Sequence, residues 1–214
     1  MKEILKYLFN YLAQFPHETI MIVAVAILFF GAIIEALPIG IFIPMESTTI
    51  FLGILAYKGI LDIKILILAS FLGMITGDIN EYFFGKKVGE KYLKKYLEKI
   101  KINKKRFEKI KKIIKNNLFK AIFFGRNSSW SRWIVPLWCG AHQINTVKFI
   151  SFDIITAFFW AFVYLLGGYY LGYGFDLYGQ DAGIGVLVFV LIVFAGYKIL
   201  KRKKSVRYTK FSRK

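Results

Sequence analysis

The stretch FFGRNSSWSRWIVPLWCGAH, residues 123–142, places two arginines among phenylalanine, tryptophan, isoleucine, leucine and valine. Arg126 and Arg132 are six positions apart, and the stretch contains no acidic residue. On a soluble helix the pair would form a solvated edge. At mid-depth in a membrane each arginine would cost roughly 2.5–3.5 kcal/mol on insertion scales, so the pair would need a physical reason to be there.

The rest of the chain indicates that a membrane is present. Of the 214 residues 57% are hydrophobic, and several long stretches carry no charge. Residues 154–175 (IITAFFWAFVYLLGGYYLGYGF) exceed the length of about 20 that a spanning helix needs, and residues 19–34 reach it with their polar flanks. A soluble domain would show amphipathic periodicity instead. We therefore predict an all-α integral membrane protein.

Basic residues are concentrated in two places. Residues 86–120 hold fifteen Lys and Arg against three Glu, and residues 198–214 hold nine against no acid. Under the positive-inside rule both are cytoplasmic segments drawn to anionic lipid headgroups. The net charge of +18 therefore indicates a membrane surface rather than nucleic acid. We expect a multi-pass protein of the cytoplasmic membrane, and the sequence leaves open whether it forms a homo-oligomer.

The apolar pattern divides the chain into segments. Residues 1–17 predict an N-terminal amphipathic helix at the membrane interface, which Pro16 ends. A transmembrane domain follows over residues 18–175, with Gly73 and Gly77 at a spacing typical of closely packed membrane helices. A basic tail, predicted to be cytoplasmic, occupies residues 201–214. The four predicted spanning helices are 18–36, 62–84, 148–172 and 183–200.

Counting crossings predicts re-entrant segments. If residues 86–120 and 198–214 are both cytoplasmic, an even number of crossings separates them, yet three apolar segments lie between. The segment 118–142, broken around Arg126, is the best candidate for entering and leaving on one side. In the N-terminal half the proline-broken stretch 38–57 would dip from the outer face. Irregular backbone at this depth must be covered by protein or line a wet cavity. Two opposed hairpins are typical of an inverted repeat with a central binding site.

Two acids complement the arginines. Glu35 ends a run of sixteen uncharged residues, and Glu46 follows Pro44 closely. An ionised carboxylate at that depth is costly, so we expect proton exchange there. Arg126 and Arg132 would neutralise these acids, hold a phosphate, or alternate between the two roles. Surface positions remain open as alternatives, with Glu46 at a helix start and both arginines reaching the cytoplasmic interface.

Other polar and aromatic residues surround this set. Asp78 follows thirteen uncharged residues, so Asp78 and Tyr82 are candidates for supporting polar roles. Glu81, close to Lys86, fits a boundary position. Three tryptophans flank the arginines and favour an interfacial aromatic belt, with stacking on arginine as the alternative. These tryptophans are Trp130, Trp133 and Trp138.

Enzymatic constellations are missing from the sequence. His17 and His142 lie far apart, one cysteine excludes an internal disulfide, and no GxxxxGK phosphate loop is present. Ser128, Ser129 and Ser131 are hydroxyls without a base. We therefore expect a transporter with no catalytic residue, metal or cofactor.

An ordered set of motifs extends over roughly residues 20–175. The motifs are Glu35, Pro38 and Pro44-x-Glu46; GILAYKG at 53–59; Gly77-Asp78 with Tyr82-x-x-Gly85-x-x-x-Gly89; Phe124-Gly125-Arg126 with Arg132; and Gly140, Phe149 and Trp160 ahead of LLGGYYLG. This ordered set resembles the DedA family, the bacterial and archaeal branch of the VTT or SNARE-associated Golgi domain proteins. After Arg126 that family usually has an aromatic residue and then a proline two further on, where this chain has Asn127 and Ser129.

The resemblance implies two facing re-entrant hairpins and movement of lipid. Bacterial members are associated with returning polyprenyl phosphate or phospholipid across the membrane in dependence on the proton gradient, and eukaryotic relatives are scramblases. The functional acids and arginines of the family match Glu35, Glu46, Arg126 and Arg132. The expected function is a proton-linked flippase or scramblase for a phosphate-bearing lipid. A proton-coupled exporter of small ions or drugs, or a non-transporting membrane adaptor, are the alternatives.

Overall fold

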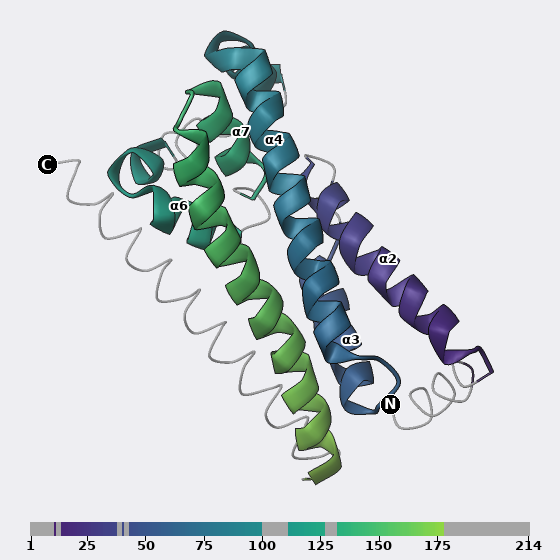
Figure 1. Ribbon diagram of the computed structural model, residues 1–214. Helices are drawn as coiled ribbons and strands as arrows, with labels where there is room; N and C mark the ends of the chain where they lie inside the picture. Colours follow the sequence, from purple (N-terminus) through teal and green to yellow (C-terminus); the bar gives the residue numbers. More distant parts are fainter. Residues whose placement is uncertain are drawn as a thin grey trace, which may run out of the picture. The chain divides into compact units, whose positions relative to one another are not determined.

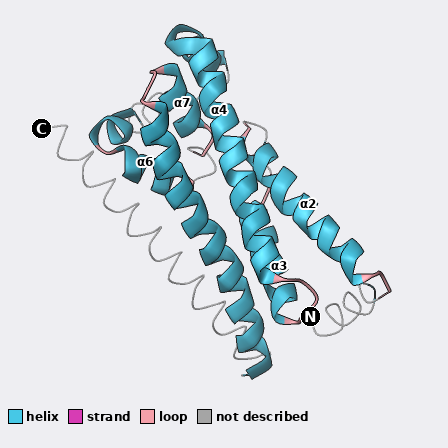
Figure 2. Ribbon diagram, viewed as in Figure 1, coloured by secondary structure: helices cyan, strands magenta, loops and turns pink. Residues whose placement is uncertain are grey.

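Helices make up all the regular structure of the described residues in this computed structural model (Figure 2). The described residues are 11, 14–37, 40, 43–99, 111–126 and 132–177, without the side chains of 91, 92 and 94–99. The all-α prediction is confirmed for these residues. In chain order the helices are α2 (His17–Ala36), α3 (Met45–Tyr57), α4 (Ile63–Lys99), a short helix over 111–116, α6 (Leu118–Gly125), α7 (Ile134–Ala141) and the helix Thr146–Leu177 (Figure 1).

Three of these helices are long and apolar enough to cross a membrane: His17–Ala36, Ile63–Glu90 within α4, and Thr146–Leu177. They confirm the predicted helices at 18–36, 62–84 and 148–172, and the second and third are longer than predicted. The chain divides into one compact unit, Met1–Tyr169, and a second, Tyr170–Lys214. The predicted span 183–200 and tail 201–214 lie outside the described residues, as does most of the predicted helix 1–17.

Short polar side chains cap the N-termini of several helices. The Asp62 carboxylate accepts the backbone N–H groups of Lys64 and Ile65 at the start of α4, at 2.7 and 3.3 Å. Asn117 caps α6 and Asn145 caps the helix Thr146–Leu177 in the same way. A helix start leaves its first N–H groups without partners inside the helix, and these side chains satisfy them.

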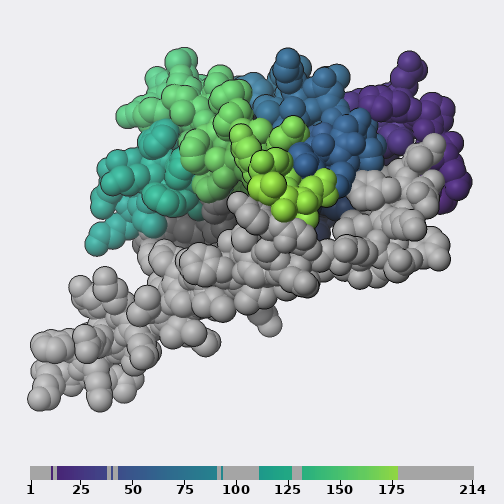
Figure 3. Space-filling view, turned by 90° about the horizontal axis from the view of Figure 1, so that it is seen from below, coloured from purple at the N-terminus to yellow at the C-terminus, as the bar shows by residue number. Residues whose placement is uncertain are grey.

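The spanning part of α4 lies between α2 and the helix Thr146–Leu177 (Figures 1 and 3). Its contact with α2 depends on Gly73 and Gly77. A Cβ at Gly73 would lie 2.6 Å from the Phe29 carbonyl oxygen, and one at Gly77 would lie 2.8 Å from the Ala36 Cβ. The predicted close-packing role of this glycine pair is therefore confirmed.

Glycines also allow close contact at two other helix interfaces, α4 with α7 and α3 with the helix Thr146–Leu177. Gly85 of α4 packs against the Leu137 backbone, while Gly140 of α7 packs against the Tyr82 backbone, so α4 and α7 touch backbone to backbone. Gly168 packs in the same way against Ile50 of α3. These contacts join α7 to the end of the spanning part of α4, and α3 to the last described helix.

The helices α3, α6 and α7 are each too short to cross a bilayer alone. At about 1.5 Å per residue, the 13 residues of α3 and the 8 each of α6 and α7 span well under the ~30 Å of a hydrocarbon core. Short helices at these two places are compatible with the predicted hairpins at 38–57 and 118–142. Both hairpins stay predictions. Figure 1 shows α7 beside the upper half of α4, and α6 beside the helix Thr146–Leu177.

The tryptophans correct one expectation. Trp133 and Trp138 are each 2% exposed and belong to a core cluster with Tyr82 and Phe149, so an interfacial belt is wrong for them. Trp130 lies outside the described residues. Large apolar side chains instead face outward along the long helices, as expected for surfaces in contact with lipid; they include Ile22, Phe30, Leu68, Phe158 and Phe162.

Candidate functional site

A buried ion pair joins α2 to the start of α7. Glu35 lies in the last turn of α2, and Arg132 lies in the turn just before α7. The Arg132 Nη1 and the Glu35 Oε2 are 2.9 Å apart, and the two side chains are only 6% and 8% exposed. A charge pair this far from water is costly unless its geometry is good. The pair is therefore a site at which losing one partner has large consequences.

The Arg132 guanidinium has further capacity to donate. Within the described residues its Nε and Nη2 atoms have no hydrogen-bond partner, although both are buried. Buried polar groups in proteins nearly always have a partner, and exceptions often mark a place for an ion, a water or a ligand. Arg132 is thus a charged donor whose hydrogen bonds are only partly made.

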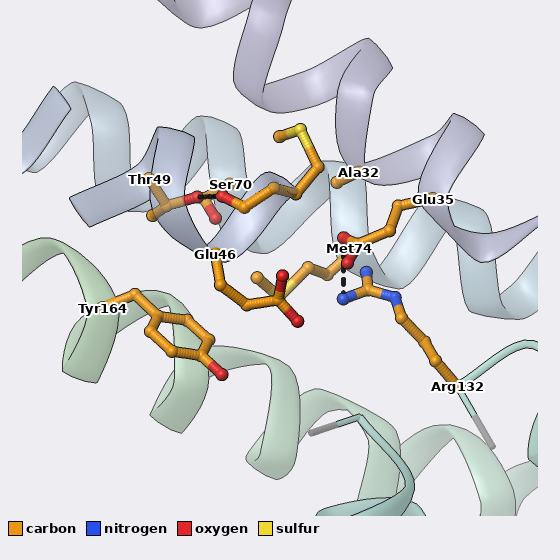
Figure 4. A pocket seen from close by; sticks show the side chains of 9 residues that line it. Ala32, Glu35, Glu46, Thr49, Ser70, Met74, Arg132 and Tyr164 are labelled. Atoms are coloured by element: carbon orange, nitrogen blue, oxygen red, sulfur yellow. Dashed lines mark hydrogen bonds and ion pairs between the residues drawn. The ribbon is translucent and has the colours of Figure 1, made fainter. Parts of the chain in front are cut away.

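Glu35 and Arg132 line a small cavity with groups from three other helices (Figure 4). Its volume is about 10 Å³, close to the space that one water molecule needs. Glu46, half-buried in the first turn of α3, points its carboxylate toward the Glu35–Arg132 pair in Figure 4, and Tyr164 lines the other side of the cavity. The full lining is Ala32, Glu35, Met45, Glu46, Thr49, Ser70, Met74, Arg132 and Tyr164.

Arg126 has different partners from those expected. Its Nη2 atom lies 2.5 Å from the Asp78 carboxylate and 2.5 Å from that of Asp153, and its Nε donates to the Thr156 hydroxyl at 3.2 Å. The exposures of the three charged side chains are 4% for Arg126, 3% for Asp78 and 1% for Asp153. Of the roles expected for Arg126, direct pairing with Glu35 or Glu46 is not seen, because α4 and the helix Thr146–Leu177 supply closer acids.

Tyr82 is buried but belongs to another contact. Its hydroxyl donates to the Ile144 carbonyl and lies 3.0 Å from the Thr146 hydroxyl, while its ring stacks on Phe149 with centroids 4.8 Å apart. These bonds tie α4 to the turn that precedes the last described helix. Tyr82 thus supports the turn rather than either arginine.

Sequence reasoning missed Asp153 and Thr156. Asp153 stands immediately before the uncharged run 154–175, so it looked like the end of a span. The structure places it inside the helix Thr146–Leu177 with 0% exposure. Its position within the predicted helix 148–172 was the available signal. Glu81 is likewise buried, at 5% exposure, where the sequence had favoured a boundary position.

Comparison with known proteins gives a family. The model of the VTT domain matches residues 43–170, which include Glu46, both arginines and both aspartates of this site. Similar curated proteins include the uncharacterized membrane protein YbfM of Bacillus subtilis, 26% identical over 63% of this chain and 83% of that protein. The inner membrane protein YohD of Escherichia coli is 28% identical over 63% of this chain and 68% of YohD. No solved structure gives a significant match.

Proposed function

The chain belongs to the VTT-domain family, the family to which its DedA-like motifs pointed, and on that premise we propose that it moves a phosphate-bearing lipid across the cytoplasmic membrane in a proton-linked manner. Polyprenyl phosphate and phospholipid are the two substrates of this class that we propose. The observation that carries the proposal is the buried Glu35–Arg132 pair beside a small cavity that Glu46 also lines.

The chemistry of the pair supports a phosphate. A guanidinium stays charged at any accessible pH and binds oxyanions through parallel N–H bonds. A carboxylate competes for the same donors when it is ionised and releases them when it is protonated. Protonation of Glu35, with Glu46 facing the same cavity, would therefore prepare Arg132 for a headgroup phosphate.

The same competition would link lipid movement to the proton. A headgroup phosphate that leaves Arg132 must be replaced by an anion, because an unpaired buried charge is strongly unfavourable. Glu35 supplies that anion by giving up its proton. Each passage of a phosphate through the site would thus be accompanied by proton release and uptake, with the apolar outer faces of the helices guiding the lipid tail.

A reconstitution experiment tests the proposal. Transbilayer movement of a fluorescent polyprenyl phosphate would be followed in proteoliposomes with and without a pH gradient, for the wild type and Arg132→Gln. We expect the gradient to accelerate movement by the wild type and the variant to abolish it. Lys120→Gln is the matched control, because it removes one positive charge from an exposed position on α6. Unaltered movement by Arg132→Gln would contradict the proposed site.

A parallel assay separates the alternatives. Fluorescent phospholipid would replace polyprenyl phosphate in the same vesicles. Movement of the phospholipid alone would retain the site and change the lipid. Equal movement of both lipids with and without protein would reject lipid transport and leave small-ion transport or an adaptor role.

A further inference from the structure

The two buried arginines differ in which edges of the guanidinium group are free. A guanidinium offers two forks for an oxyanion, one formed by Nε and Nη2 and the other by Nη1 and Nη2. In Arg132, Glu35 occupies Nη1, while Nε and Nη2 have no hydrogen-bond partner among the described residues. One complete fork of Arg132 is therefore open.

Arg126 offers no complete fork. Its Nε donates to Thr156, and its Nη2 is bonded by both Asp78 and Asp153. Nη1 alone has no partner among the described residues. Since Nη2 belongs to both forks, a phosphate could take a two-pronged position on Arg126 only by displacing the carboxylates.

Charge reinforces the contrast. With both carboxyls ionised, the Arg126 group would carry a formal charge of −1, on side chains at most 4% exposed. Both carboxylates bond the guanidinium directly. Phosphate would meet this negative group at close range in a medium of low dielectric constant, where repulsion is strong. At Arg132 one carboxylate, Glu35, bonds the guanidinium, and the second acid of the cavity, Glu46, forms no ion pair with Arg132 among the described residues.

The Arg126 group also connects three elements. Arg126 ends α6, Asp78 belongs to the spanning part of α4, and Asp153 and Thr156 belong to the helix Thr146–Leu177. Arg132 follows only six residues later. A fixed Arg126 therefore determines where the chain that carries Arg132 leaves α6.

We propose that the two arginines have separate roles: Arg132 receives the lipid phosphate on its Nε–Nη2 fork, whereas Arg126, held by Asp78 and Asp153, is a positioning residue that does not contact the phosphate. The Arg132 role rests on the proposed function. The Arg126 role rests on the geometry of the Asp78–Arg126–Asp153 clamp alone. Asp153 thereby becomes a functional residue of the positioning kind.

Lysine substitutions separate the two roles. Binding of farnesyl monophosphate to the purified full-length protein in detergent would be measured for the wild type, Arg132→Lys and Arg126→Lys. Lysine keeps the charge and loses the fork, so Arg132→Lys should raise the Kd about ten-fold or more. Arg126→Lys should alter the Kd less than about two-fold, because a lysine keeps a positive charge beside the aspartates. Equal rises in both variants would overturn the division of roles.

Neutralising the whole clamp gives an independent readout. Arg126→Gln alone leaves two buried carboxylates without their cation, so melting temperature and transport should both fall. Adding Asp78→Asn and Asp153→Asn removes those charges and should restore the melting temperature and most of the transport rate. A triple variant that melts like the wild type but stays inactive would show that Arg126 contacts the substrate. A triple variant that melts no higher than Arg126→Gln would overturn the clamp.

The two parts of the inference fail separately. If the wild type binds no farnesyl monophosphate and moves no lipid phosphate, the proposed function fails and the Arg132 assignment fails with it. The clamp is still decided by the melting temperatures of the single and triple variants. If the wild type binds farnesyl monophosphate and Arg132→Lys binds it with the same Kd, the Arg132 assignment is refuted. Lipid-phosphate transport would still stand as the proposed function.

Discussion

Glu35 and Arg132 form a buried ion pair in which the Oε2 and Nη1 atoms are 2.9 Å apart, joining the end of α2 to the start of α7. Among the described residues, neither Glu35 nor Arg132 forms a second ion pair. Removing one side chain therefore leaves the other charge in a dry environment.

Glu35→Ala should destabilise the protein by about 3–5 kcal/mol, the usual cost of breaking a buried pair from one side. Glu35→Gln should cost less, because the amide oxygen still accepts from Arg132. Melting temperatures of the detergent-solubilised variants measure both effects. An unchanged melting temperature for Glu35→Ala would mean that Arg132 reaches water or another acid.

Glu46→Gln should strengthen phosphate binding, because it removes a carboxylate that lines the same cavity as Arg132. Carboxylates beside Arg132 repel a phosphate bound there. The ratio of variant to wild-type Kd for farnesyl monophosphate, taken at several pH values, should therefore lie below one.

Glu18→Gln serves as the control for this experiment, since Glu18 is exposed at the opposite end of α2 from Glu35. Its Kd ratio should stay near one throughout. A ratio near one for Glu46→Gln as well would separate Glu46 from the phosphate site.

Gly140→Ala should disrupt the contact between α7 and α4. The added Cβ would collide with the Tyr82 carbonyl, a backbone atom that cannot move without shifting the helix. Overpacking of this kind costs about 1–3 kcal/mol, and more where backbone resists. Gly167→Ala is a matched control, because a Cβ there meets nothing within 4 Å. Comparable melting temperatures for the two variants would contradict the close approach.

Tyr82→Phe should lower stability without changing substrate affinity. The phenyl ring keeps the stacking on Phe149 but removes the bond to the Ile144 carbonyl, at a cost of about 1–3 kcal/mol for a buried group left unsatisfied. Melting temperature and the Kd for farnesyl monophosphate give the two readouts. A weakened Kd at unchanged stability would place Tyr82 in the binding site after all.

The sequence alone identified Glu35 and Arg132 as candidate site residues, because long apolar runs isolate them. An isolated charge in a membrane segment is costly and needs a physical reason. The sequence could not predict which acid pairs with which arginine. Which acid meets which arginine depends on how closely α4 approaches its neighbours, and glycines such as Gly77 and Gly85 set that approach in three dimensions. Asp153 escaped notice because an acid beside an apolar run is also what the end of a span looks like.

The crossing count behind the predicted hairpins can be tested with single cysteines. Cys139 is the chain's one cysteine and is 0% exposed, so it provides an unreactive background for impermeant thiol reagents. Lys58, Lys112 and Lys148 are exposed positions before α4, before α6 and after α7. Each would be replaced by cysteine in turn and labelled in intact cells and in inverted membrane vesicles.

If 118–142 enters and leaves on the cytoplasmic side, Lys112→Cys and Lys148→Cys should both react in inverted vesicles, and Lys58→Cys should react in intact cells. A segment that crossed the membrane would instead put positions 112 and 148 on opposite sides. That result would also reverse the side from which the helix Thr146–Leu177 enters. The parity argument from the basic segments would then be wrong, because the two segments could no longer share one side through an even number of crossings.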